Sequence, residues 1–119
     1  MKARFIIFAF ALPTAATAQS YSESMADCAS FYQNAAQWVR TDEKAEQIMA
    51  NTRKWHAAAV TQARAEGRPV TADAMWDKIN AKTDAWEAKG LGFAFTQEFR
   101  DWASYCRKFA KHTGVDLTF

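Results

Sequence analysis

Few side chains in this sequence have the types and spacing that catalysis or metal binding needs. The chain has two cysteines and two histidines, at Cys28, Cys106, His56 and His112. The cysteines have neither the C-x-x-C spacing of redox sites nor the C-x-x-C-H spacing of covalent haem attachment. No H-E-x-x-H motif, nucleophile elbow or phosphate-binding glycine loop is present. We therefore expect no enzyme activity and predict no catalytic residue, metal ligand or cofactor site.

The histidines and the closest carboxylate pair have structural explanations. Asp73 and Asp77 are four residues apart on a predicted helix, and Lys78 beside them indicates a solvated face. His56 falls beside the apolar stripe of its helix, where we expect a partly buried ring bonded to a neighbour. His112 is in the last turn of the final predicted helix, where a cation offsets the negative helix end. None of these residues by itself predicts a functional site.

The N-terminal residues 1–18 are typical of a secretory signal peptide. Lys2 and Arg4 precede an unbroken apolar run, which is followed by a proline and by small residues up to Ala18. The run is too short for a membrane anchor, which needs about 20 apolar residues. We expect cleavage after Ala18, one mature domain over residues 19–119 without a membrane span, and a periplasmic or secreted location.

Export changes the interpretation of both the charge and the cysteines. Without Lys2 and Arg4, the chain carries 13 basic and 13 acidic side chains, so we expect no nucleic-acid partner. In an oxidising compartment, two cysteines favour a structural disulfide between Cys28 and Cys106. A disulfide that closes a loop of about 80 residues stabilises the fold by about 4–5 kcal/mol in the chain-entropy model.

Four amphipathic segments predict the fold. Apolar residues recur at steps of three and four, and no stretch alternates as a strand would. The expected helices cover about 22–40, 42–66, 72–89 and 95–113. Short loops between amphipathic helices favour an all-α, antiparallel up-down-up-down four-helix bundle. Cys28 and Cys106 would then come to the same height and join the first and last helices.

The last helix has the most regular stripe of the four. Its large or stripe-compatible residues are Phe95, Phe99, Trp102, Cys106, Phe109 and Thr113. Gly114 follows with Val115 behind it, the pattern of a Schellman stop. We expect the tail, residues 115–119, to fold back on the bundle, with a segment that meets a partner as the alternative.

Five tryptophans are many for a chain of this size. Four of them fall on core stripes: Trp55, Trp76, Trp86 and Trp102. An aromatic core is the favoured interpretation. The alternative is an aromatic-lined pocket or patch, for which the candidates are the apolar residues least clearly placed in the core: Trp38, Leu91, Phe93 and Phe119.

Met25 opens the first predicted helix and His112 closes the last one. This pairing resembles the soluble b-type cytochromes built on four-helix bundles, in which a methionine and a histidine at these places hold haem. The resemblance implies an alternative function, a ligand or b-type haem carrier that uses Met25 and His112. The chain departs from the pattern because His112 falls beside the stripe, and because a Cys28–Cys106 bridge would occupy the space that haem needs. The favoured function is a binding or accessory role in the cell envelope, on a protein partner whose identity the sequence leaves open.

Overall fold

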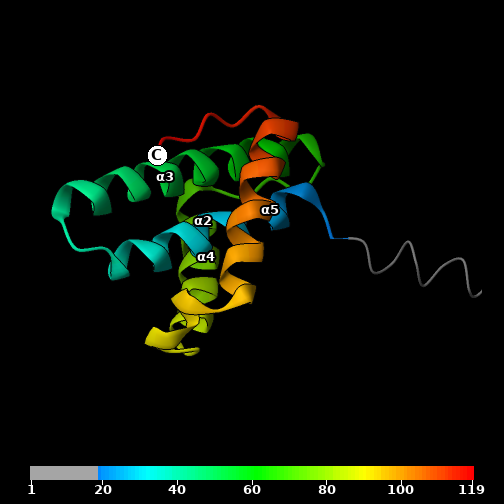
Figure 1. Ribbon diagram of the computed structural model, residues 1–119. Coiled ribbons are helices and arrows are strands. Elements are labelled where there is room, and N and C mark those ends of the chain that lie inside the picture. The colour runs from blue at the N-terminus through cyan, green and yellow to red at the C-terminus, as the bar shows by residue number, and fades with distance from the viewer. Residues whose placement is uncertain (1–18) are drawn as a thin grey trace, which may run out of the picture.

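The computed structural model describes residues 19–119, and Figure 1 shows its helices. The predicted signal peptide and its cleavage after Ala18 lie outside the described residues. The four helices are α2 (Tyr21–Ala35), α3 (Asp42–Ala65), α4 (Ala72–Glu87) and α5 (Gln97–Thr113). Two 3-10 turns, η1 (Ala36–Trp38) and η2 (Leu91–Phe95), separate α2 from α3 and α4 from α5. Residues 19–119 contain no strand, and the predicted all-α fold of four helices is confirmed.

Each helix begins directly after a hydroxyl residue. The side-chain oxygen of this residue accepts a hydrogen bond from a backbone N–H of the first turn, which would otherwise have no partner inside the helix. The four N-cap residues are Ser20, Thr41, Thr71 and Thr96. These local contacts fix the helix starts.

The end of α5 is a glycine stop. Gly114 takes the left-handed conformation with φ of 80°, which favours glycine over other residues. The N–H of Val115 donates to the carbonyl of Ala110 at 2.9 Å, which is the hydrogen bond that spans six residues in a Schellman motif. The predicted stop is confirmed, and it directs the tail back toward α3.

The first helix ends earlier than predicted. α2 stops at Ala35 rather than near Arg40, and η1 takes the chain round toward α3. Val39 and Thr41 are extended, with ψ of 161° and 151°. The reason is that Thr41 can cap α3 only from an extended backbone, so the residues before it leave the helix to make the turn.

The start of the last helix was also predicted wrongly. Residues 91–95 form the turn η2, and α5 begins at Gln97. Phe93 points inward and is 6% exposed, whereas Phe95 is 79% exposed. Phe95 therefore does not belong to the buried stripe, and Phe93 is not a surface candidate. The tighter 3-10 turn rotates these side chains away from the positions that an α-helix would give them.

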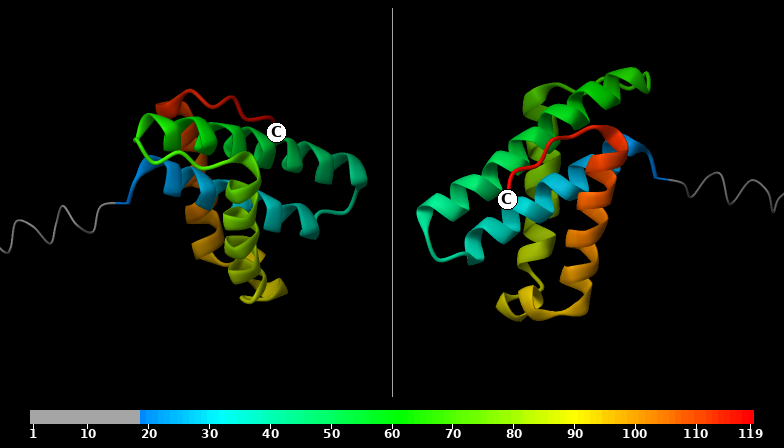
Figure 2. Two further views of the ribbon diagram at one scale, coloured as in Figure 1. Left: turned by 180° about the vertical axis from the view of Figure 1, so that it is seen from behind. Right: turned by 45° about the horizontal axis from the view of Figure 1, so that its top comes forward.

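The helices form two antiparallel pairs. α2 packs antiparallel against α3, and α4 and α5 run antiparallel to each other on either side of the turn η2, as Figure 1 shows. The second pair crosses the first rather than running along it (Figure 2). α2 lies against all three other helices and is the central element of the core. α2 and α5 consequently touch over a short stretch only.

The core is filled by residues from all four helices. The largest of the core side chains that are at most 2% exposed are Trp55, Phe31, Met75 and Ile79. Small residues on α2, Ala26 and Ala29, are fully buried and let the neighbouring helices approach closely. On α4 the buried face is formed by Met75, Ile79 and Thr83.

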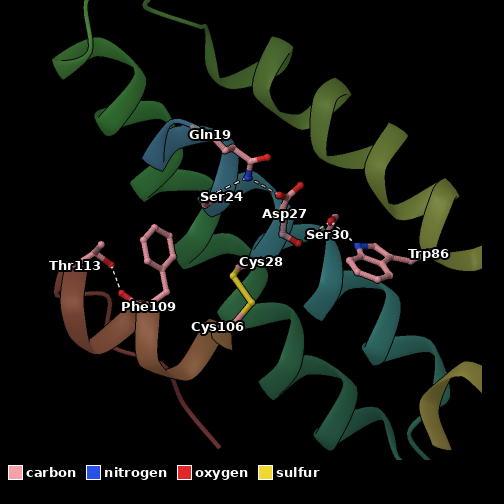
Figure 3. The surroundings of a disulfide bond; sticks show 9 residues. All are labelled: Gln19, Ser24, Asp27, Cys28, Ser30, Trp86, Cys106, Phe109 and Thr113. Carbon is pink, nitrogen blue, oxygen red and sulfur yellow. Dashed lines mark hydrogen bonds between the residues drawn. A yellow bond between two sulfur atoms is a disulfide. The ribbon is translucent and has the colours of Figure 1, made fainter. Parts of the chain in front are cut away.

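The disulfide between Cys28 and Cys106 joins α2 and α5, as predicted (Figure 3). The two Cα atoms are 5.7 Å apart and both side chains are fully buried. The bridge lies where the two helices cross. It therefore supplies much of the direct connection between the first and last helices.

A second long-range contact joins the start of α2 to the end of α3. The carboxylate of Glu66 accepts from the backbone N–H of Ser22 at 3.1 Å and from its hydroxyl at 2.6 Å. Burial alone would raise the pKa of Glu66, but these bonds and one from Gln62 outweigh it and lower the pKa. A negative charge at the N-terminus of α2 also suits the helix dipole.

In residues 19–119, no helix is long and apolar enough to cross a membrane.

Candidate binding surface

The structure separates Met25 from solvent and leaves His112 on the surface. Met25 is part of the buried core. His112 is exposed, and a hydrogen bond of 3.0 Å joins its Nε2 to the hydroxyl of Tyr21. Neither side chain lines the grooves described below. The haem-carrier alternative stays a prediction, which an absorption spectrum with added haem would test.

His56 has a structural role at the junction of α3 and α4. Its Nε2 donates to the carbonyl oxygen of Ala72 at 2.9 Å. Its ring stacks on Trp76, with centroids 4.0 Å apart and planes 10° from parallel. Both contacts tie the first turn of α4 to α3, which accounts for a half-buried histidine at this position.

Within residues 19–119, no three His, Cys, Asp or Glu side chains gather as a metal site would require.

The tryptophans divide between the core and a groove. Trp55 is fully buried and stacks on Phe109, with centroids 5.5 Å apart. Trp86 and Trp102 are only half-buried, and their rings meet edge to face at 5.2 Å. The predicted aromatic core is therefore one part of the arrangement, and a partly open aromatic surface is the other.

Trp102 lines two neighbouring grooves, which we call together the aromatic groove. One, of about 200 Å³, has walls from Trp86, Lys82 and Lys89 of the α4 side. The other, of about 320 Å³, lies along α5 between Trp102 and Tyr105. Tyr105 is 41% exposed, and its ring meets Trp102 edge to face at 5.5 Å. Aromatic side chains that remain open to solvent in a groove are typical of binding surfaces.

A network of charges holds Asp27 and Lys82, two residues that line the aromatic groove. Lys82 bridges Glu23 at 2.7 Å and Asp27 at 2.8 Å, which ties α4 to α2. Burial alone would lower the pKa of Lys82, but the hydrogen bonds that its ammonium donates to these two carboxylates raise it. The amide of Gln19 donates to the other oxygen of Asp27 at 2.8 Å (Figure 3). Lys82 is thus neutralised within the protein and serves to position α4.

Trp86 is held in place by a polar contact. Its indole Nε1 donates to the hydroxyl of the fully buried Ser30 at 2.9 Å, as Figure 3 shows. The Nζ of Lys89 lies 6.0 Å from the centroid of the Trp86 ring and 3.6 Å from the Glu98 carboxylate. One wall of the groove is therefore an indole ring held by a hydrogen bond, with the ammonium of Lys89 near it.

The tip of the α4–α5 hairpin carries exposed apolar side chains. Leu91 is 60% and Phe95 is 79% exposed, both on η2. The sequence indicated Leu91 as a surface candidate, together with Trp38 and Phe119, and these three are exposed. It missed Phe95 and Tyr105. Tyr105 lies off the predicted stripe of the last helix, a signal that could have placed it on the surface.

Comparison of the chain with protein-family models, with curated proteins and with solved structures finds no match in any of the three.

Proposed function

We propose that this protein is exported and acts by binding another protein of the cell envelope through the aromatic groove and the neighbouring η2 tip. The observation that carries the proposal is the set of solvent-exposed apolar side chains on the α4–α5 pair. Leu91 and Phe95 are mostly exposed on η2, and Trp102 and Tyr105 line an open groove on α5. The proposal includes no catalytic step.

The physical argument rests on the cost of exposing apolar surface. Burying a side chain such as Leu91 or Phe95 on a partner is favourable by about 2 kcal/mol each. Neither side chain contributes that energy to the fold, because both are exposed. Tryptophan and tyrosine in preformed pockets are also the residues that contribute most to protein interfaces. A partner that presents apolar side chains therefore suits this surface.

Export agrees with two properties of the described chain. The Cys28–Cys106 disulfide is compatible with an oxidising compartment, and residues 19–119 contain no membrane-spanning helix. The intact mass of the protein from the exported fraction tests this part. A mass that starts at Gln19 and lacks two hydrogens is expected, whereas a mass that retains residues 1–18 would contradict it.

Site-specific photo-crosslinking tests the binding surface. A photoreactive phenylalanine analogue at position 95 should capture one defined envelope protein, and the same analogue at Thr61, an exposed position on α3, should not. The double substitution Leu91→Ser, Phe95→Ser should abolish the capture made by an analogue at Tyr105. Because both residues are exposed, this variant should unfold at the same urea concentration as the wild type.

Reconstitution of the captured pair decides the outcome. The purified partner should bind the wild-type protein and lose at least tenfold in affinity for Trp102→Ala. Equal binding of the wild type and both variants would refute a role for this surface. Equal capture from positions 95 and 61 would have the same meaning.

A further inference from the structure

The tail, residues 115–119, lies as an extended segment over α3, where Figures 1 and 2 show it in red. Val115 and Leu117 are half-buried and pack against the core, whereas Asp116 and Thr118 between them are exposed. Successive side chains of an extended segment point to opposite sides, so this alternation places one face of the tail on the protein. The expected fold-back of the tail is confirmed.

Asn51 of α3 binds the backbone of the tail. Its Nδ2 donates to the carbonyl oxygen of Thr118 at 2.8 Å, and its Oδ1 accepts from the N–H of Thr118 at 2.7 Å. Asn51 is fully buried. Its amide therefore engages both backbone groups of one residue, as a neighbouring strand would, and does not select the side chain of that residue.

Lys54, one turn further along α3, makes the next contacts with the tail. Its Nζ donates to the carbonyl oxygen of Asp116 at 2.6 Å and to the hydroxyl of Thr118 at 3.0 Å. Asn51 and Lys54 together bind main-chain groups of two alternate tail residues. A site of this kind accepts an extended peptide by its backbone and excludes a helix, whose main-chain groups are already paired.

A cavity of about 210 Å³ remains beside the tail. Its α5 wall carries Arg107 and Lys111, and its other wall is the tail itself, including Asp116 and Phe119. The ring of Phe119 lies 6.3 Å from that of Tyr32 on α2, yet Phe119 is 64% exposed. The tail therefore does not fill the space available, and the two cations favour a ligand with a carboxylate at this place.

We propose that Tyr32, Asn51, Lys54, Arg107 and Lys111 form a peptide-binding groove, the tail groove, which the protein's own residues 115–119 fill in the free state. The ligand is an extended segment of another chain, apolar at alternate positions with a carboxylate between them. Loss of the tail alone would give up both hydrogen bonds of the Asn51 amide and the packing of Val115 and Leu117 on the core. Exchange of one segment for another restores those bonds. This proposal uses no residue of the aromatic groove and is independent of it.

A synthetic peptide with the sequence of residues 114–119, labelled with a fluorophore at its amino end, tests the exchange. The purified wild-type protein should bind it weakly, because the tail competes. Thr118→Pro in the protein removes the N–H that Asn51 accepts and loosens the tail, so this variant should bind the peptide at least tenfold more tightly. Equal affinity of the two proteins would overturn the proposal.

Two further measurements test the role of Asn51, and the first of them needs no substitution at Asn51 itself. Methylation of the peptide nitrogen that corresponds to Thr118 removes the same donor without changing the protein, and should weaken binding to the Thr118→Pro protein at least tenfold. Adding Asn51→Leu to Thr118→Pro should abolish binding, whereas adding Asn80→Leu, at an exposed asparagine of α4, should not. Tight binding of the methylated peptide, or equal effects of the two asparagine changes in folded proteins, would show that Asn51 does not bind the ligand backbone.

Discussion

Removal of the disulfide should destabilise this protein more than any single substitution at an exposed position of α5. In Cys28→Ala, Cys106→Ala the bridge between α2 and α5 is lost, and the two side chains that replace it are small enough to fit. Side-chain contacts such as Tyr21–Phe109 and Phe31–Phe99 would remain between the two helices. The expected loss of stability therefore comes mainly from the unfolded chain, which gains conformational freedom when the loop is open.

The magnitude follows from the length of the closed loop. With a sequence separation of 78, the chain-entropy model gives a loss of about 4.5 kcal/mol in the free energy of unfolding. Removal of two fully buried sulfur atoms adds about 1 kcal/mol from lost packing. For a domain of this size, the corresponding decrease in melting temperature is about 20–35 °C.

Urea unfolding followed by circular dichroism at 222 nm measures this loss. The wild-type protein under reducing conditions separates the effect of opening the loop from that of removing the sulfur atoms. Ser104→Ala, two residues from Cys106 on α5, is the matched control and should change the free energy of unfolding by less than about 0.5 kcal/mol. A loss below about 1 kcal/mol for the double alanine variant would refute the reasoning, because the unfolded chain would then gain little freedom from an open loop.

Three further predictions concern polar groups that are buried or half-buried. Burial raises the pKa of Tyr32 to about 12, and its hydroxyl has no hydrogen-bond partner among the residues that the structure describes. A raised pKa makes the folded state lose stability as the pH rises above about 10, so Tyr32→Phe should be at least as stable as the wild type at pH 7 and should reduce the alkaline loss. Burial alone would raise the pKa of Glu23, but hydrogen bonds from two lysines of α4 lower it below 4.5. Its contribution to stability is present above the unfolded pKa and is lost as the pH falls through the folded value, so urea midpoints measured between pH 6 and pH 3 should fall, and fall less for Glu23→Gln. Ser30→Ala should leave the Trp86 indole N–H without its acceptor and lower the free energy of unfolding by about 1–2 kcal/mol, as measured by urea unfolding.

Each of these predictions has a result that would contradict it. A Tyr32→Phe protein less stable than the wild type by more than about 1 kcal/mol would show that the hydroxyl has a favourable contact. Identical acid dependence of the wild type and Glu23→Gln would show that the lysine contacts do not lower the pKa of that carboxylate. Trp86→Phe removes the donor, so Ser30→Ala should cost less in that background. An unchanged cost would mean that Ser30 contributes by packing and not by its bond to Trp86.

The parts of the fold that the sequence predicts well depend on contacts within one turn of helix. The capping residues Thr41, Thr71 and Thr96 each bond a backbone N–H three residues ahead, so their positions are readable from local spacing. Gly114 ends α5 for an equally local reason, its left-handed backbone. The disulfide was predictable because the chain has only two cysteines and a segment typical of export.

The candidate surfaces were less predictable because they depend on which elements meet. Phe95 continues the period of the last helix in sequence, yet the turn η2 places it outside and brings Phe93 inside. The bonds from Asn51 reach a residue 67 positions away. Asn51 lies in the middle of a helix, where an asparagine carries no pattern that indicates such a partner. The aromatic groove likewise requires α4 and α5 to be side by side.

The sequence by itself determined that this chain makes four capped helices, with an apolar face on each and one possible disulfide. Those properties follow from periodicity and from bonds between near neighbours, which the order of residues specifies directly. Only the tertiary structure decided that the helix pairs cross, that Trp86 and Trp102 border an open groove, and that Asn51 holds residues 115–119. The physical reason is that such contacts join residues far apart in the chain, and their geometry exists only once α2 has brought the other three helices together.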